Sequence, residues 1–136
     1  MSRTILIALG LALGTASACA MPIAHVDEQS GGFRRVDVET FAKEFDAGAF
    51  KLVVDVRTAE EYAGGHVPGA VNIPIDQLKG RLAELEPHRA DKIGVICQSG
   101  RRSLAASMTL AEAGFTGVVD VEGGTGAWIS AGHKVE

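Results

Sequence analysis

Residues Cys97 to Ser103 bring together residue types that can do sulfur or anion chemistry. The segment holds the thiol of Cys97, a glycine at position 100 and two adjacent arginines, Arg101 and Arg102. It leads from an apolar run into a segment with helical spacing, and the backbone N–H groups at the start of a helix are unpaired and attract anions. A helix start and nearby arginines favour the thiolate of a cysteine, which makes it nucleophilic near neutral pH. Cys97 is therefore the candidate catalytic residue.

The residues that follow Cys97 are candidates for holding an anionic substrate. A glycine permits the tight curl that lets backbone amides converge on one point. The predicted substrate-binding residues are Gln98, Ser99, Gly100, Arg101 and Arg102. Two alternatives stay open: Cys97 could be an ordinary buried cysteine beside solvent-exposed arginines, or it could pair with a distant histidine as in cysteine proteases.

Metal chemistry is not indicated by the sequence. The four histidines, His25, His66, His88 and His133, show no ligand spacing relative to Cys97. We therefore predict no metal site, and thiolate chemistry requires no organic cofactor.

Strand and helix patterns alternate along the chain, and connections between them are short. Apolar runs predict strands over 52–56, 70–73, 93–96 and 118–121. Helices are predicted from a cap at Asp37 to a stop at Gly48, over 58–63 with a Thr58–Glu61 capping box, after a cap at Asp76, from Ser103 as cap to Ala113, and over 125–130. This alternation predicts an α/β fold with a largely parallel sheet covered on both faces. Sites in such folds lie beyond the carboxyl ends of strands, where Cys97 stands.

The N-terminal segment has the pattern of an export signal. Arg3 precedes an apolar run from Ile5 to Leu13, and small residues follow around positions 16 to 20. We predict a signal peptide over 1–20, a linker over 21–33 and one folded domain over 34–133, with the mature protein exported to the periplasm. A lipoprotein signal that leaves Cys19 lipidated and an uncleaved membrane anchor are the alternatives, and only these would place the protein on a membrane.

Composition and charge fit one globular domain. Apolar residues make up 46% of the 136 residues and charged residues 22%, and the formal net charge is −4. An acidic chain of this kind argues against general nucleic-acid binding.

Three ordered motifs resemble the rhodanese superfamily. They are Asp55 to Thr58 followed by Gly65 to Pro74, the Cys97 to Ser103 loop, and Glu122 to Trp128. The resemblance implies a rhodanese-like α/β fold with a central sheet of about five strands. It also implies that Cys97 carries a persulfide and that residues 98 to 102 hold the sulfur. The expected partners are a small anionic sulfur donor such as thiosulfate and a cyanide, thiol or protein acceptor.

Loop length separates two chemistries on this fold. The phosphatases that share it have five residues between cysteine and arginine, whereas Arg102 follows Cys97 after four and Ser103 stands at the phosphatase spacing. We therefore expect a sulfurtransferase, with a phosphatase less favoured. A sulfur-carrier or partner-binding module with little turnover of small donors is the alternative from another class.

Overall fold

The described part of the chain folds around one central sheet. The computed structural model describes residues 29–30 and 32–136. In this part the strands are β1 (Gln29–Ser30), β2 (Phe33–Val36), β3 (Leu52–Asp55), β4 (Val71–Asn72), β5 (Lys92–Ile96) and β6 (Gly117–Val121). Their order is β1-β2-β6-β5-β3-β4, and every neighbouring pair except β1 with β2 is parallel. The predicted α/β fold with a parallel sheet of five strands is confirmed, and β1 adds a short antiparallel edge.

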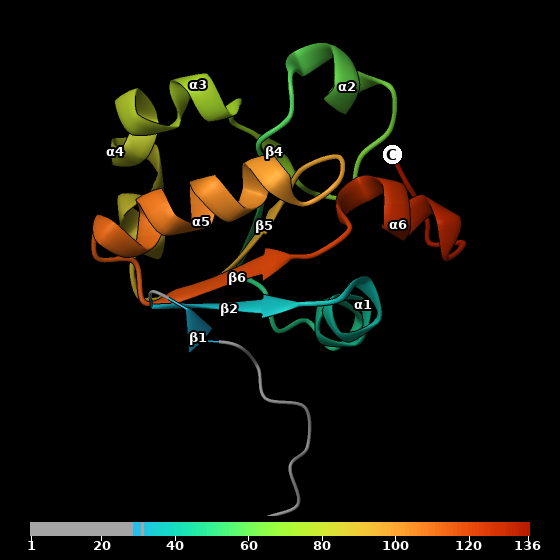
Figure 1. Ribbon diagram of the computed structural model, residues 1–136, viewed down its shortest axis with the longest axis horizontal. Coiled ribbons are helices and arrows are strands. Elements are labelled where there is room, and N and C mark those ends of the chain that lie inside the picture. The colour runs from blue at the N-terminus through green and yellow to red at the C-terminus, as the bar shows by residue number, and fades with distance from the viewer. Residues whose placement is uncertain (1–28, 31) are drawn as a thin grey trace, which may run out of the picture.

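Helices cover both faces of this sheet (Figure 1). They are α1 (Val38–Asp46), α2 (Ala59–Ala63), α3 (Ile75–Leu78), α4 (Leu82–Leu85), α5 (Arg101–Glu112) and α6 (Gly124–Ser130), with 3₁₀ turns at Lys79–Arg81 and Glu86–His88. Leu78, Leu85 and Leu110 pack on one face, from α3, α4 and α5. Phe41 of α1 and Trp128 of α6 pack on the other. Two apolar layers therefore fix the sheet, and its parallel strands end along one edge.

Two helix starts follow the predicted capping chemistry. The Asp37 carboxylate accepts from Thr40 N–H at the start of α1. At α2, Thr58 accepts from Glu61 N–H at 3.2 Å, and the Glu61 carboxylate accepts from Thr58 N–H at 3.3 Å. Both caps satisfy N–H groups that the first helical turn leaves unpaired.

Two other predicted helix starts are wrong. Pro74, not Asp76, stands at the N-cap of α3, because the ring of proline presets the backbone dihedral that begins a helix. Ser103 lies inside α5, whose N-cap is Gly100 with φ of 102°. A left-handed residue at position 100 turns the chain early, so the helix begins at Arg101.

The sheet also extends into the predicted linker over 21–33. Phe33 is buried and begins β2, and β1 lies within the same predicted linker. The pairing of β2 with β6 buries this segment, although its own pattern is not strand-like. The predicted signal peptide over 1–20 and Cys19 lie outside the described residues. Within the described residues, no helix has the length and apolar character needed to cross a membrane.

Candidate active site

Cys97 stands at the end of β5, in a turn that leads directly into α5. Gly100 closes this turn with φ of 102°, and its N–H donates to Cys97 Sγ at 3.0 Å. A Cβ atom at position 100 would lie 3.1 Å from the backbone nitrogen of Gly123. Glycine is therefore required both by the left-handed backbone and by the close approach of a second loop.

Polar groups converge on the Cys97 sulfur although the residue is buried, with 1% of its surface exposed. Burial raises the pKa of the thiol, but the Ser103 hydroxyl and the N–H groups of Ser103, Gly100 and Ser99 lower it further than burial raises it. The Ser103 Oγ lies 3.5 Å from Sγ. Hydrogen bonds to the charged form explain the net lowering, since they stabilise the thiolate.

Backbone N–H groups at the start of α6 donate to carbonyl groups of the Cys97 loop. Thr125 N–H donates to the Cys97 carbonyl at 2.7 Å, and Gly126 N–H donates to the Gln98 carbonyl at 3.1 Å. Gly124 has φ of 60°, and a Cβ atom there would lie 2.4 Å from the Cys97 carbonyl oxygen. The glycine pair at 123 and 124 therefore allows one loop to lie against the other.

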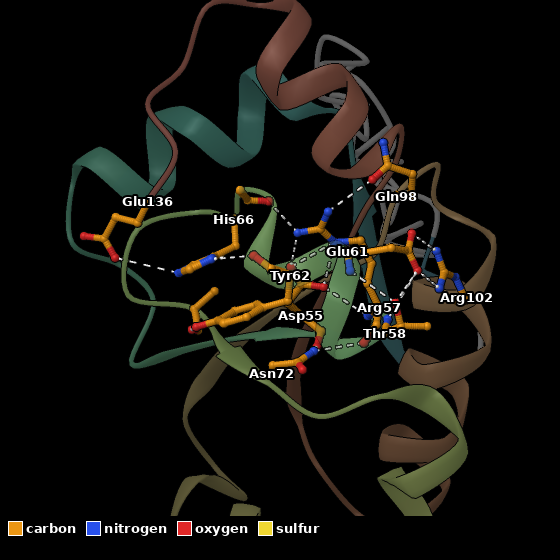
Figure 2. A network of polar contacts seen from close by, with 12 residues as sticks. Asp55, Arg57, Thr58, Glu61, Tyr62, His66, Asn72, Gln98, Arg102 and Glu136 are labelled. Atoms are coloured by element: carbon orange, nitrogen blue, oxygen red, sulfur yellow. Dashed lines mark hydrogen bonds and ion pairs between the residues drawn. The ribbon is translucent and has the colours of Figure 1, made fainter.

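A buried ion pair between Arg57 and Asp55 contacts the Cys97 loop at Gln98 (Figure 2). Arg57 is 3% exposed and donates through Nε and Nη2 to Asp55, with the shortest contact at 2.7 Å. Its Nη2 also donates to the Gly65 carbonyl at 2.8 Å, and its Nη1 donates to Gln98 Oε1 at 3.1 Å. Asn72 ties the backbone carbonyls of Asp55 and Arg57 through its side-chain amide. These motif residues connect the loops beside Cys97 to one another.

The two arginines of the loop have different surroundings. Arg102 donates to both carboxylate oxygens of Glu61, at 2.7 and 2.8 Å (Figure 2). Arg101 is exposed, as are Gln98 and Ser99. The predicted substrate-binding residues 98 to 102 therefore lie in one turn. Within it the Arg102 side chain is held by Glu61, whereas the Arg101 side chain is exposed to solvent.

Sequence reasoning missed several partners of this turn. Ser103 was assigned to the helix cap, but its hydroxyl contacts the sulfur. The sequence predicts only a capping box for Glu61, whereas the structure shows that Glu61 also pairs with Arg102. The sequence predicts no contact between the backbone amides of α6 and the loop. Gly123 and Gly124 could have indicated the contact between α6 and the loop, because two adjacent glycines often mark a close approach of two backbone segments. Among the described residues, no group of three or more His, Cys, Asp or Glu side chains is arranged to hold a metal ion.

The chain matches the model of the rhodanese-like domain over residues 37–131. It belongs to the rhodanese-like domain family. Among curated relatives, thiosulfate sulfurtransferase 16, chloroplastic, of Arabidopsis thaliana is 42% identical over 89 residues, covering 58% of this chain and 74% of the relative. Thiosulfate sulfurtransferase PspE of Escherichia coli is 41% identical over 70 residues, covering 52% of this chain and 67% of the relative.

A solved structure shows the same rhodanese-like fold. The rhodanese-related protein of Thermoplasma volcanium is 36% identical, with a TM-score of 0.68, and the match covers 76% of this chain and 97% of that one. The chain spans between 55% and 74% of the length of three curated relatives that it matches. The family and the fold are thereby established for this chain.

Proposed function

We propose that this rhodanese-like domain is a sulfurtransferase that carries sulfane sulfur as a persulfide on Cys97. The observation that carries the proposal is the convergence of Ser99, Gly100 and Ser103 donors on a sulfur whose pKa they lower. A site built this way stabilises negative charge on sulfur without a metal or an organic cofactor. The names of the sulfurtransferase relatives in Arabidopsis thaliana and Escherichia coli agree with this assignment.

The first half-reaction loads sulfur from an anionic donor such as thiosulfate. The Cys97 thiolate attacks the outer sulfur, a new S–S bond forms on Cys97, and the S–S bond of thiosulfate breaks with its electron pair leaving on sulfite. The negative charge then rests on the terminal persulfide sulfur, where the loop amides can donate to it. Because Cys97 is only 1% exposed, a small terminal sulfur atom suits the site better than a bulky group.

The second half-reaction returns the enzyme to its starting state. Cyanide or a thiolate attacks the terminal sulfur, the S–S bond on Cys97 breaks, and its electron pair restores the Cys97 thiolate. Loading and unloading are therefore a double displacement through one covalent intermediate. A protein thiol is a further acceptor of the same chemistry.

We assign separate roles to the two arginines. Arg101 is exposed at the rim and would attract anionic donors by charge. Arg102 is held by Glu61, and this pair would keep the helix start and the loop in place. This engagement also disfavours a phosphatase, in which an arginine must turn to the phosphate.

Two cysteines in the chain provide a matched test. The full chain is incubated with thiosulfate and weighed intact by mass spectrometry. We expect the Cys19→Ser variant to gain one sulfur atom and the Cys97→Ser variant to gain none. Equal gains by the two variants, or no gain in either, would overturn the assignment. Repeated turnover with cyanide then identifies an enzyme, whereas a single discharge to a protein thiol identifies a sulfur carrier.

Export is a further part of the proposal. The signal over residues 1–20 predicts a periplasmic mature protein, and cleavage after residue 18 or 20 would leave a chain without its apolar segment. The intact mass of the protein purified from cells reports the cleavage site, and a lipid-sized mass addition on Cys19 would indicate a membrane-anchored lipoprotein instead.

A further inference from the structure

Buried polar side chains lie under the first turns of α5, on the sheet face that Cys97 shares. Side chains alternate between the faces of a strand. On β6, Val118 packs in the cluster that contains Cys97 and Val119 packs in the opposite cluster, which places Asp120 on the Cys97 face. Arg35 is paired with Asp120 in register on the neighbouring strand β2.

Two buried serines lie on the same face of α5. Ser103 and Ser107 are four residues apart on one helical face and are both fully buried. Ser103 Oγ contacts Cys97 Sγ, whereas Ser107 Oγ has no hydrogen-bond partner among the described residues. Ser103 is thus the hydroxyl that touches the sulfur, and Ser107 is a matched hydroxyl one turn away.

The Asp120 carboxylate is fully buried and incompletely bonded. Arg35 Nε lies 3.2 Å from its Oδ2, on a side chain that is 29% exposed. Among the described residues, no donor meets either Asp120 oxygen in full hydrogen-bond geometry. Burial raises the pKa of the Asp120 carboxyl, and an interaction with the Ser103 hydroxyl opposes that rise without cancelling it. A buried carboxyl with spare acceptors is costly unless it bonds, so a small shift of the Ser103 side chain that lets its hydroxyl donate to Asp120 would be favourable.

We propose that Asp120 is a positioning residue that acts through the Ser103 hydroxyl to set the protonation state of Cys97. The proposal rests on the proposed function, since a thiolate is the form that accepts sulfur. It adds to that function a residue on a different strand that does not touch the sulfur.

The proposal involves two arrangements of the same protons among Asp120, Ser103 and Cys97. With Asp120 ionised, the Ser103 O–H points to the carboxylate, and the Ser103 lone pairs accept the thiol proton of Cys97. In the other arrangement, that proton moves from Sγ to Ser103 Oγ while the Ser103 proton moves to Asp120. Ser103 then donates to the Cys97 thiolate, and Asp120 is neutral. The net charge of the site is unchanged, so the buried cluster can form a thiolate without releasing a proton to solvent.

The surroundings of Asp120 and of Cys97 shift their pKa values in opposite directions. Burial raises the pKa of Asp120, the Ser103 hydroxyl and Arg35 of β2 lower it, Glu122 raises it, and Val121 N–H lowers it, with a net rise. The pKa of Cys97 is lowered. Two groups titrate as a coupled pair when they interact with each other. The Ser103 hydroxyl contributes to both pKa shifts and is the group through which Asp120 and Cys97 would interact. The charge of Cys97 also reaches Arg102, whose pKa is raised by Glu61 first and in smaller part by Cys97.

The test measures the thiol pKa of Cys97 in full chains that carry Cys19→Ser, from thiolate absorbance and from alkylation rate against pH. Asp120→Asn places an amide that donates to Ser103 Oγ, which leaves the Ser103 O–H free to donate to sulfur. We expect this variant to lower the thiol pKa by about one unit, the scale of a hydrogen bond to the charged form. In a Ser103→Ala background the same substitution should leave the thiol pKa unchanged.

Two results would overturn the proposal. An unchanged thiol pKa in Asp120→Asn removes the connection, and an equal shift with and without Ser103 shows that the carboxylate acts by charge alone. Ser107→Ala is the matched control and should not move the thiol pKa. Sulfur loading is measured separately, so a Cys97 that takes no sulfur contradicts the proposed function whatever these pKa values are.

A second measurement covers the case in which Asp120→Asn does not fold. The Asp120 carboxyl is followed by carbon NMR over pH in the protein with Cys97 intact and in Cys97→Ala. We expect a two-step titration with the thiol present and a single step without it, because a coupled pair titrates in two macroscopic steps. Identical curves in the two proteins would overturn the proposal.

Discussion

At the scale of single residues, Cys97 shows how a buried thiol can be reactive. Burial alone raises the pKa of a thiol and makes it inert. Here the same turn that buries the sulfur also brings the Ser103 hydroxyl and backbone N–H groups close to it, and their combined effect on the pKa of the thiol exceeds that of burial. The reactivity therefore depends on the Ser103 hydroxyl as well as on the backbone geometry of the turn.

Arg57 joins the buried Asp55 carboxylate to Gln98 of the loop, and its removal gives a direct test of this connection. Arg57→Ala would leave the fully buried Asp55 carboxylate unpaired and remove the bond to Gln98. Breaking a buried ion pair in this way costs about 3–5 kcal/mol. We expect a loss of this size in the free energy of unfolding, measured by urea denaturation.

A surface pair provides the control for Arg57. Arg81 pairs with Glu84 within one helical stretch, and the two side chains are 33% and 54% exposed. Exposed pairs contribute little to stability, so Arg81→Ala should leave the free energy of unfolding nearly unchanged. Equal losses in the two variants would show that the Arg57 pair is no more than a surface contact.

At the scale of elements, the start of α6 packs against the backbone of the Cys97 loop and helps to shape the site. We expect Gly124→Ala to destabilise the fold by more than about 2 kcal/mol, since the added methyl meets backbone oxygens and the residue needs a positive φ. Sulfur loading should fall with stability, because the displaced atoms belong to Cys97 and Gln98. Unfolding by urea and loading by mass spectrometry measure the two effects.

Gly132 is the matched control, because it has φ of 83° but no atom within 4 Å of the added methyl. Gly132→Ala should cost about 1 kcal/mol of backbone strain and leave sulfur loading unchanged. If Gly124→Ala behaves like this control, the α6 start does not shape the loop.

Elements with their own local signals were predictable from the sequence, and those that depend on distant partners were not. The caps of α1 and α2 follow from Asp37 and from Thr58 with Glu61. Strand β2 was missed because Phe33 and Val36 flank two arginines, a pattern that becomes a strand only by pairing with β6. The helix predicted after Asp76 is broken into short turns at Lys79–Arg81 and Glu86–His88, which its leucine spacing does not reveal.

At the scale of the whole molecule, the same rule decides how much of the site could be predicted. Cys97 and its loop are contiguous in sequence, so a strand followed by a glycine turn and a helix was enough to propose them. Asp120 and Arg35 reach the site only because β6 lies between β2 and β5 in the sheet. No local pattern encodes this strand order, and the distant residues around the sulfur therefore required the structure.

The Glu61–Arg102 pair joins two distant parts of the molecule, and its contribution should appear in the stability of the whole fold against pH. Hydrogen bonds from Arg102 lower the pKa of Glu61 to about 2. An unfolded glutamate has a pKa of about 4.3. A carboxyl whose pKa is lowered by folding stabilises the fold fully above its unfolded pKa, and this stabilisation is lost as the pH falls through its folded pKa of about 2.

Glu61→Gln isolates this contribution, because glutamine can keep the capping box while losing the charge. Both side chains of the pair are about one-third exposed, so solvent screening limits the loss to about 1 kcal/mol at neutral pH. Urea unfolding at several pH values should show this difference between the unaltered chain and Glu61→Gln, shrinking as the pH falls below about 4.3 and vanishing only below pH 2. Glu60→Gln removes the same charge from the same helix outside the pair and serves as the control. A difference that stays constant from neutral pH to pH 2 would mean that the ion pair does not hold α2 against α5.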